Sequence, residues 1–282
     1  MPNLRPDLAA AGLRDVHQAQ RLGPYLNSLW VRRSYIWFVS KSELRNRQMT
    51  SVLGNLWHLL NPLLQVAVFY LIFGVVLTGV RLGADNYVLF LTVGVLIFSD
   101  TQRSVIAGGN SIVNNRGVIQ AIRFPRALLP VTATVTEMLA SVPNVIVIYG
   151  MAVLTGETPH IRWLCVALVV GAQFWFNLGM ACVAARATTH FRDTAQILPF
   201  VFRILMYISG IIFSVETFTA DKSYGWLFDI NPIYAYVSLA RWCMLGGPLL
   251  AVWLIVAAVW TVGILVFGFL WFRAAEDRYA RL

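Results

Sequence analysis

The chain has 282 residues, of which 58% are hydrophobic and only 12% are charged, and its formal net charge at pH 7 is +9. A water-soluble domain of this size needs more charge to cover its surface, so the composition excludes an ordinary soluble fold and indicates a membrane protein. The excess of basic residues does not require nucleic acid, because cytoplasmic loops of membrane proteins are rich in arginine and lysine. We expect membrane lipids, and no nucleic acid, as partners.

The apolar segments are continuous rather than alternating, which favours helices over a transmembrane barrel. We predict an all-α integral membrane protein with six spans, at about 56–77, 87–113, 128–154, 163–185, 195–215 and 249–272. A spanning helix needs about 20 residues, so the length of the chain suits this number. In domain terms, 1–26 is a cytoplasmic tail, 27–50 an amphipathic interfacial helix and 51–282 the transmembrane domain.

Residues 27–50 mix aromatic with basic side chains. Trp30 and Trp37 lie seven positions apart, and Arg45 and Arg47 follow them. The pattern predicts a helix in the membrane interface, with its aromatic rings at headgroup level. A solvated charged helix is the alternative.

Asp100, Glu137 and Arg203 are charged residues at membrane depth within the predicted spans. Such charges are costly unless they are paired or line a wet cavity. On a helix, Arg203 shares one face with Phe200 and Tyr207, and a sugar chain packs well against rings that carry a hydrogen-bond donor. This face is therefore a candidate channel lining, as are Tyr70 and Phe73 of the first span. The alternative is that Arg203 pairs with Glu137 or Asp100.

The orientation follows from the basic residues. With the N-terminus in the cytoplasm, seventeen Lys and Arg residues lie in inner segments and four in outer loops, which predicts that both termini are cytoplasmic. The outer segment between spans five and six holds seven aromatic residues. We expect short re-entrant helices there, with Asn231 and Pro232 at the turn between them and Arg241 further along. An ordinary aromatic belt at the interface is the alternative.

Several catalytic motifs are absent from the sequence. It contains no phosphate-binding loop G-x-x-x-x-G-K-[ST], no nucleophile elbow G-x-S-x-G and no pair of histidines at metal-ligand spacing. We therefore expect a non-catalytic chain without a metal or a cofactor of its own.

Four segments resemble permeases of the ABC-2 type that export bacterial polysaccharides. The entry to span one carries that family's pattern at Arg47, Ser51, Leu53, Gly54, Leu56, Trp57, Asn61 and Pro62. A cytoplasmic segment carries it at Asn114 or Asn115, Val118, Ile119, Phe124, Pro125, Arg126, Leu129 and Pro130. The turn before span five matches at Arg192 and Asp193, and the outer motif matches at Asn231, Pro232 and Arg241. The resemblance runs from about residue 27 to the C-terminus.

In that family, the segment between spans two and three is a short coupling helix seated in a groove of a cytoplasmic ATPase. The resemblance implies this role for Asn115, Arg116, Val118, Ile119, Ile122, Arg123, Phe124, Pro125 and Arg126. The residue types suit it, because Asn115 can cap a helix, an apolar face follows and Pro125 ends it. Val118 stands where the family usually has leucine. An ordinary basic loop is the alternative.

The resemblance implies a permease subunit in the plasma membrane of a bacterium. Two copies of this chain would bind two copies of an ATPase, which would hold ATP and magnesium, and would move a lipid-linked polysaccharide outward. O-antigen, teichoic acid and cell-wall galactan exporters belong to the family, and the arginine-rich composition favours the actinobacterial galactan exporters. The alternatives are an ABC-2 permease for a drug or lipid, a channel without an ATPase and a membrane glycan enzyme. A membrane glycan enzyme should carry a cluster of carboxylates in its outer loops, whereas the outer carboxylates of this chain are dispersed.

Overall fold

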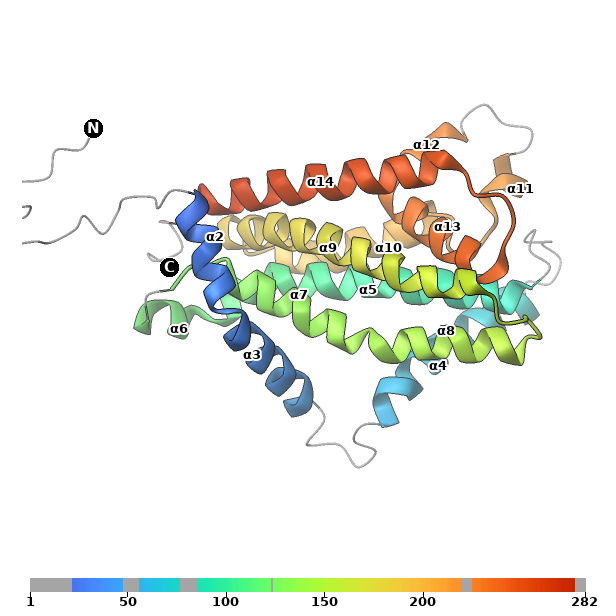
Figure 1. Ribbon diagram of the computed structural model, residues 1–282, viewed down its shortest axis with the longest axis horizontal. Coiled ribbons are helices and arrows are strands. Elements are labelled where there is room, and N and C mark those ends of the chain that lie inside the picture. The colour runs from blue at the N-terminus through green and yellow to red at the C-terminus, as the bar shows by residue number, and fades with distance from the viewer. Residues whose placement is uncertain (1–21, 48–55, 77–85, 123, 220–224, 277–282) are drawn as a thin grey trace, which may run out of the picture.

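The computed structural model describes residues 22–47, 56–76, 86–122, 124–219 and 225–276. Every regular element within these ranges is a helix, which confirms the predicted fold class, and Figure 1 shows the long helices side by side in one bundle. Within the described ranges, five helices are long and apolar enough to cross a membrane.

The five long helices have bounds close to the predicted spans. They are α4 (Trp57–Phe69) with the π-helix η2 (Tyr70–Val76), α5 (Tyr87–Asn114), α7 (Leu128–Ala140) with α8 (Val142–Leu154), the 3-10 turn η3 (Ile161–Leu164) with α9 (Cys165–His190), and α14 (Ala251–Arg273). Pro143 stands in the first turn of α8, where the missing N–H costs nothing, so α7 and α8 join end to end at Ser141.

Helix α5 lies at the centre of the bundle. Asn86 caps it by accepting a hydrogen bond from the Leu89 amide at 3.2 Å, and its first half is almost wholly buried. Small residues allow neighbouring helices to come close: Gly108 of α5 faces Ala181 of α9, and Gly179 of α9 lies against the backbone of α14 near Ile264. Close backbone approach at such residues is a common way to pack helices in membranes.

The fifth predicted span is shorter than expected. Helix α10 (Thr194–Ile208) has 15 residues and ends seven residues before the predicted end at 215. The chain turns at Gly210, whose φ of +60° favours glycine, and Asn231 donates a hydrogen bond to the Ser209 hydroxyl at 2.9 Å. At 1.5 Å per residue, α10 covers only about 22 Å of a hydrocarbon core that is about 30 Å thick.

The N-terminal region is more structured than predicted. Helix α2 (Leu22–Val31) lies partly within the expected tail, and the buried ring of Tyr25 packs against Phe269. Helix α3 (Arg33–Asn46) follows and runs obliquely across α7 (Figure 1), where the Ser40 hydroxyl donates to the Thr132 carbonyl at 3.1 Å. The aromatic rings of α2 and α3 at positions 30 and 37 are exposed, as an interfacial helix requires.

Three short helices connect α10 to α14: α11 (Val215–Thr219), α12 (Trp226–Asp229) and α13 (Pro232–Leu245). Helix α13 is buried along most of its length and packs against α5, α9 and α14. Tyr234 and Tyr236 of α13 are buried with it, whereas Phe218 of α11 and Trp226 of α12 are exposed, so the aromatic residues of this region divide between the core and the surface.

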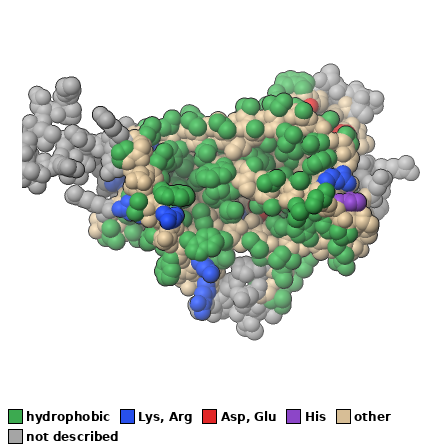
Figure 2. Space-filling model, viewed as in Figure 1, with side chains coloured by type: hydrophobic (Ala, Val, Ile, Leu, Met, Phe, Trp, Pro, Cys, Tyr) green, Lys and Arg blue, Asp and Glu red, His purple; other side chains and the backbone are tan. Residues whose placement is uncertain are grey.

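The bundle has two distinct ends. One, which we call the α6 end, holds α2, the short helix α6 (Arg116–Ala121) and the last turn of α14, whereas the other, the α13 end, holds α11, α12 and α13 (Figure 1). Figure 2 shows hydrophobic side chains over the face between these ends, with Lys and Arg side chains at the α6 end, near the far end of α3 and beside a histidine at the α13 end. The two described termini therefore lie at the same end.

Candidate functional site

The predicted coupling segment forms a short helix at the α6 end. Asn115 precedes α6 but does not cap it, because its side-chain amide donates to the Ser111 carbonyl at 2.8 Å. The helix ends at Ala121 and Pro125 follows in the next turn, so the chain leaves the helical conformation before the proline, as expected. Arg123 lies outside the described residues.

The apolar side chains of α6 point in different directions. Val118 and Ile122 are exposed, whereas Ile119 is 8% exposed and belongs to a core cluster with Ile112 and Phe272. The expectation that all three face a partner is therefore wrong for Ile119, which anchors α6 to its own bundle. Two guanidinium nitrogens of Arg116, Nε and Nη2, are buried and have no hydrogen-bond partner among the described residues.

A hydrogen-bonded junction holds the coupling segment against the ends of the chain. The Tyr25 hydroxyl donates to Glu276 Oε1 at 3.0 Å, and the Arg126 amide donates to the same oxygen at 2.8 Å. The Ala127 amide donates to the Tyr25 hydroxyl at 3.3 Å. Burial raises the pKa of Tyr25 well above its usual range, and the neighbouring Glu276 carboxylate raises it further. The phenol therefore stays protonated and keeps donating.

The two intramembrane carboxylates are paired. Glu137 accepts from Arg47 at 2.7 Å and lies 3.8 Å from Arg103, while Asp100 accepts from Arg103 and from the Asn144 amide, both at 2.5 Å. The interfacial helix is thus tied to α7 through an ion pair between residues 90 positions apart. Pairing explains how these charges are tolerated inside the bundle.

Arg203 is not part of this network. It is exposed on α10, its guanidinium carbon lies 5.5 Å from the centre of the Phe200 ring, and it has no carboxylate partner among the described residues. The alternative in which Arg203 pairs with Glu137 or Asp100 is therefore wrong, because Arg47 and Arg103 occupy those carboxylates.

The other channel candidates also lie at the surface of the single chain. Phe200 is 63% exposed and Tyr207 is 53% exposed, on the same face of α10 as Arg203. Tyr70 is exposed on η2, while Phe73 is half-buried and stacks on Phe69 with ring centres 6.2 Å apart. The side chains of the α10 face therefore lie on the outside of the described part of the chain.

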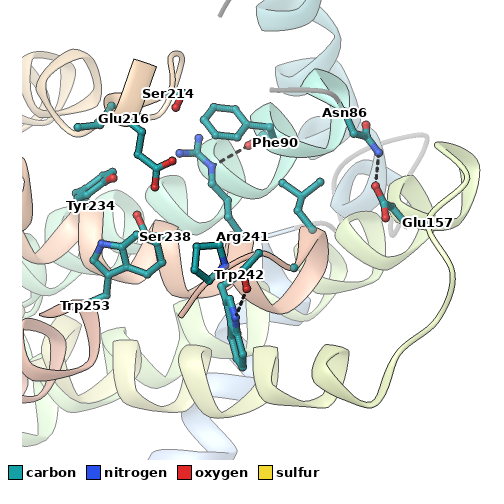
Figure 3. A pocket seen from close by; sticks show the side chains of 15 residues that line it. Asn86, Phe90, Glu157, Ser214, Glu216, Tyr234, Ser238, Arg241, Trp242 and Trp253 are labelled. Atoms are coloured by element: carbon teal, nitrogen blue, oxygen red, sulfur yellow. Dashed lines mark hydrogen bonds between the residues drawn. The ribbon is translucent and has the colours of Figure 1, made fainter. Parts of the chain in front are cut away.

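The outer motif at the α13 end is a structural joint. Asn231 caps α13 by accepting from the Ile233 amide at 3.0 Å, and Pro232 occupies the first turn. Arg241, which is 8% exposed, donates to the carbonyls of Phe90, Gly210 and Ile211 at 3.2, 2.8 and 2.7 Å. Its guanidinium carbon lies 3.3 Å from the centre of the Phe90 ring. Figure 3 shows it pointing toward Phe90.

Sequence reasoning did not single out three of the residues that build these sites. Arg103 and Asn144 hold Asp100, and Gly94 makes room for Arg241, since a Cβ there would stand 2.6 Å from Arg241 Nη2. An isolated glycine in an apolar helix is a recognised sign of close approach, so Gly94 could have been found. Asn144 carries no such sign.

Residues 34–245 match the model of the family described as "ABC-2 type transporter". The chain is also similar to a curated O-antigen export system permease protein RfbA from Klebsiella pneumoniae, with 25% identity over 244 residues that cover 84% of this chain and 92% of that protein. A protein of the same name from Myxococcus xanthus is 27% identical over 216 residues, which cover 76% of this chain and 81% of the relative.

Proposed function

Since this chain belongs to the ABC-2 type transporter family, we propose that it is the membrane-spanning permease subunit of a polysaccharide exporter driven by a separate ABC ATPase. The relatives that cover most of the chain are named as O-antigen export permeases, which favours a polysaccharide cargo over a drug or a lipid. ATP and magnesium would be held by the ATPase, because this sequence has no phosphate-binding loop.

The ATPase contact is assigned to α6. Val118 of α6 and Ile122, the extended residue directly after it, present apolar surface to the solvent, and a short segment with two exposed apolar side chains suits a groove in a partner. The junction of Tyr25, Arg126 and Glu276 would transmit a push on α6 to α2 and α14.

The observation that carries the channel proposal is the exposure of Arg203. An arginine on the surface of an apolar helix is costly against lipid but acceptable beside water. The α10 face therefore borders an aqueous path, and a second copy of this chain would be needed to enclose it. Phe200 and Tyr207 would offer rings to the sugar chain, and Arg203 would donate to its hydroxyls or to the phosphate of a lipid carrier.

This arrangement implies a homodimer in the plasma membrane of a bacterium, with two ATPase copies at the α6 end and both termini in the cytoplasm. Arg116 of α6 and Arg273 of the last turn of α14 lie at that end, which supports this orientation. Cell-wall galactan on a lipid carrier is the cargo that the arginine-rich composition favours. An ABC-2 permease for a drug or lipid is the second candidate, because the apolar surface of the bundle also suits such cargo.

Replacing Tyr207 or Arg203 by alanine should abolish most export while leaving the thermal unfolding midpoint in detergent almost unchanged. Both side chains are exposed and Arg203 has no carboxylate partner in the described chain, so the fold loses little. Export is measured as surface polysaccharide on cells that carry only the variant.

Two matched variants accompany this experiment. Phe267→Ala removes an exposed ring from α14 and should leave export intact, whereas Arg203→Lys keeps the charge and should retain part of it. Normal export by both Tyr207→Ala and Arg203→Ala would place the path elsewhere. A large fall in the unfolding midpoint for Arg203→Ala would assign the arginine to structure instead.

A further inference from the structure

A pocket of about 380 Å³ opens at the α13 end, between the start of α5, α11, α13 and the start of α14. Its walls include Phe90, Glu216, Tyr234, Ser238, Arg241 and Trp253. Figure 3 shows the side chains of Glu216, Tyr234, Ser238 and Trp253 gathered on one side of Arg241. At ~30 Å³ per water, the volume has room for about a dozen waters, which is the size range of one sugar residue.

Trp253, one of the residues that line the pocket, carries a buried N–H without an acceptor among the described residues, and this nitrogen does not face the open space of the pocket. Trp253 is 6% exposed, and its Nε1 has no hydrogen-bond partner in the described part of the chain. An indole N–H can only donate, and burying it unpaired is unfavourable. The comparable nitrogens of Trp242 and Trp260 donate to carbonyls, at 3.1 and 3.0 Å. Trp163 Nε1 is also unpartnered, but Trp163 does not line this pocket.

Hydrogen-bond acceptors line the pocket. The Glu216 carboxylate forms no ion pair with a described residue, and Glu157, across the pocket, accepts a hydrogen bond from the Asn86 amide at 2.9 Å. The hydroxyls of Tyr234 and Ser238 can donate or accept. Figure 3 shows the indole nitrogen of Trp253 on the ring edge toward Tyr234.

The chemistry of the walls limits what can bind. Two carboxylates oppose an anion, the buried guanidinium of Arg241 opposes a cation, and the Glu216 carboxylate with the hydroxyls of Tyr234 and Ser238 opposes a lipid tail. A neutral ligand with many hydroxyls can donate to Glu216, exchange hydrogen bonds with Ser238 and lay its CH face on a ring.

We propose that this pocket binds a neutral sugar residue, and that it does so as the polysaccharide leaves the channel. The inference rests on the proposed export function for its place in transport, because Arg241 holds the turn after α10, the helix assigned to the channel, against the pocket. Glu216 would accept from the hydroxyls of the sugar, and the ring of Trp253 in the pocket wall would pack against its CH face.

The test uses the full-length chain, labelled with 5-fluorotryptophan, in lipid nanodiscs. Among its ten tryptophans, the ¹⁹F resonance of Trp253 is identified by its loss in Trp253→Phe and by its displacement in Tyr234→Phe, whose ring centre lies 6.4 Å from that of Trp253. Methyl β-D-galactopyranoside and methyl α-D-glucopyranoside are the neutral probes, and glucuronate and choline are the charged ones. Trp226, exposed on α12, serves as the reference.

A neutral glycoside should shift the Trp253 resonance to saturation, while Trp226 and the charged probes give no shift. Glu216→Gln should weaken the apparent affinity about tenfold, because a charged acceptor is replaced by a neutral one, whereas Asp229→Asn on α12 should not. The proposal is overturned if neither glycoside moves Trp253 at about 100 mM, a hundredfold above a millimolar Kd. It is equally overturned if the charged probes or Trp226 respond in the same way.

This outcome is separable from that of export. The Trp253 resonance could shift with a neutral glycoside while deletion of the gene leaves cellular export intact. That result would contradict the proposed export function but support sugar binding in the pocket. If the chain is required for export but the Trp253 resonance does not shift, only the proposal of sugar binding in the pocket is overturned.

Discussion

Arg241→Ala should destabilise the folded permease by about 3 kcal/mol, the largest loss we expect from a single substitution. The change strands the carbonyls of Gly210 and Ile211 in a buried joint, and each unsatisfied group costs about 1–3 kcal/mol, whereas the Phe90 carbonyl lies inside α5 and keeps its helical hydrogen bond. Relief from burying an unpaired charge offsets part of this cost. The measurement is the thermal unfolding midpoint of the purified chain in detergent.

Two further variants make this expectation specific. Arg241→Lys keeps the charge, but lysine cannot reach all three carbonyls. Its unfolding midpoint should therefore lie between those of the wild type and Arg241→Ala. Gly94→Ala places a Cβ 2.6 Å from Arg241 Nη2 and 3.1 Å from the Ile211 carbonyl oxygen, so it should also lower the midpoint. A normal midpoint for both Arg241→Ala and Gly94→Ala would show that this joint does not stabilise the fold.

The double change Val118→Asp and Ile122→Asp should remove the ATPase from the complex, with at least a tenfold loss in copurification. Both side chains are exposed, so the permease should fold normally. In the complex, two carboxylates would be buried in an apolar groove, at a cost of several kcal/mol. The yield of ATPase bound to tagged permease is the measurement.

The controls come from the same helix. Gln120→Asp adds a charge at an exposed polar position and should leave the complex intact. Ile119→Asp should instead lower the unfolding midpoint of the permease alone, because Ile119 lies in its own core. If the double variant keeps its ATPase, the contact lies outside α6.

Apolar runs predicted the long helices well, because each run lacks charges over the length of a span. These runs did not show where α10 ends, because apolar residues continue through Ile211 and Ile212. The turn at Gly210 does not change the hydropathy of the sequence. The tail was misjudged for a related reason. The apolar residues of α2 are spaced for a helix, but the buried one, Tyr25, packs against Phe269, which is distant in sequence.

Side-chain partners were harder to predict than helices. The cost of charge in a membrane pointed to Asp100 and Glu137, but Arg47 and Arg103 could be recognised as their partners only once α3, α5 and α7 were packed. The same holds for Ile119, whose burial depends on how α6 folds back on the bundle. Trp253 lies in a uniformly apolar span, and only the three-dimensional arrangement reveals its unpaired nitrogen.

The central claim, that this chain exports a polysaccharide assembled on a lipid carrier, is tested most directly by deleting its gene and following the glycan. The account predicts that surface polysaccharide disappears while the lipid-linked polymer accumulates in the cytoplasmic leaflet, and that the wild-type gene restores export. Loss of surface polysaccharide without such accumulation would indicate a glycan enzyme. Unchanged surface polysaccharide with no accumulation would contradict the export function itself.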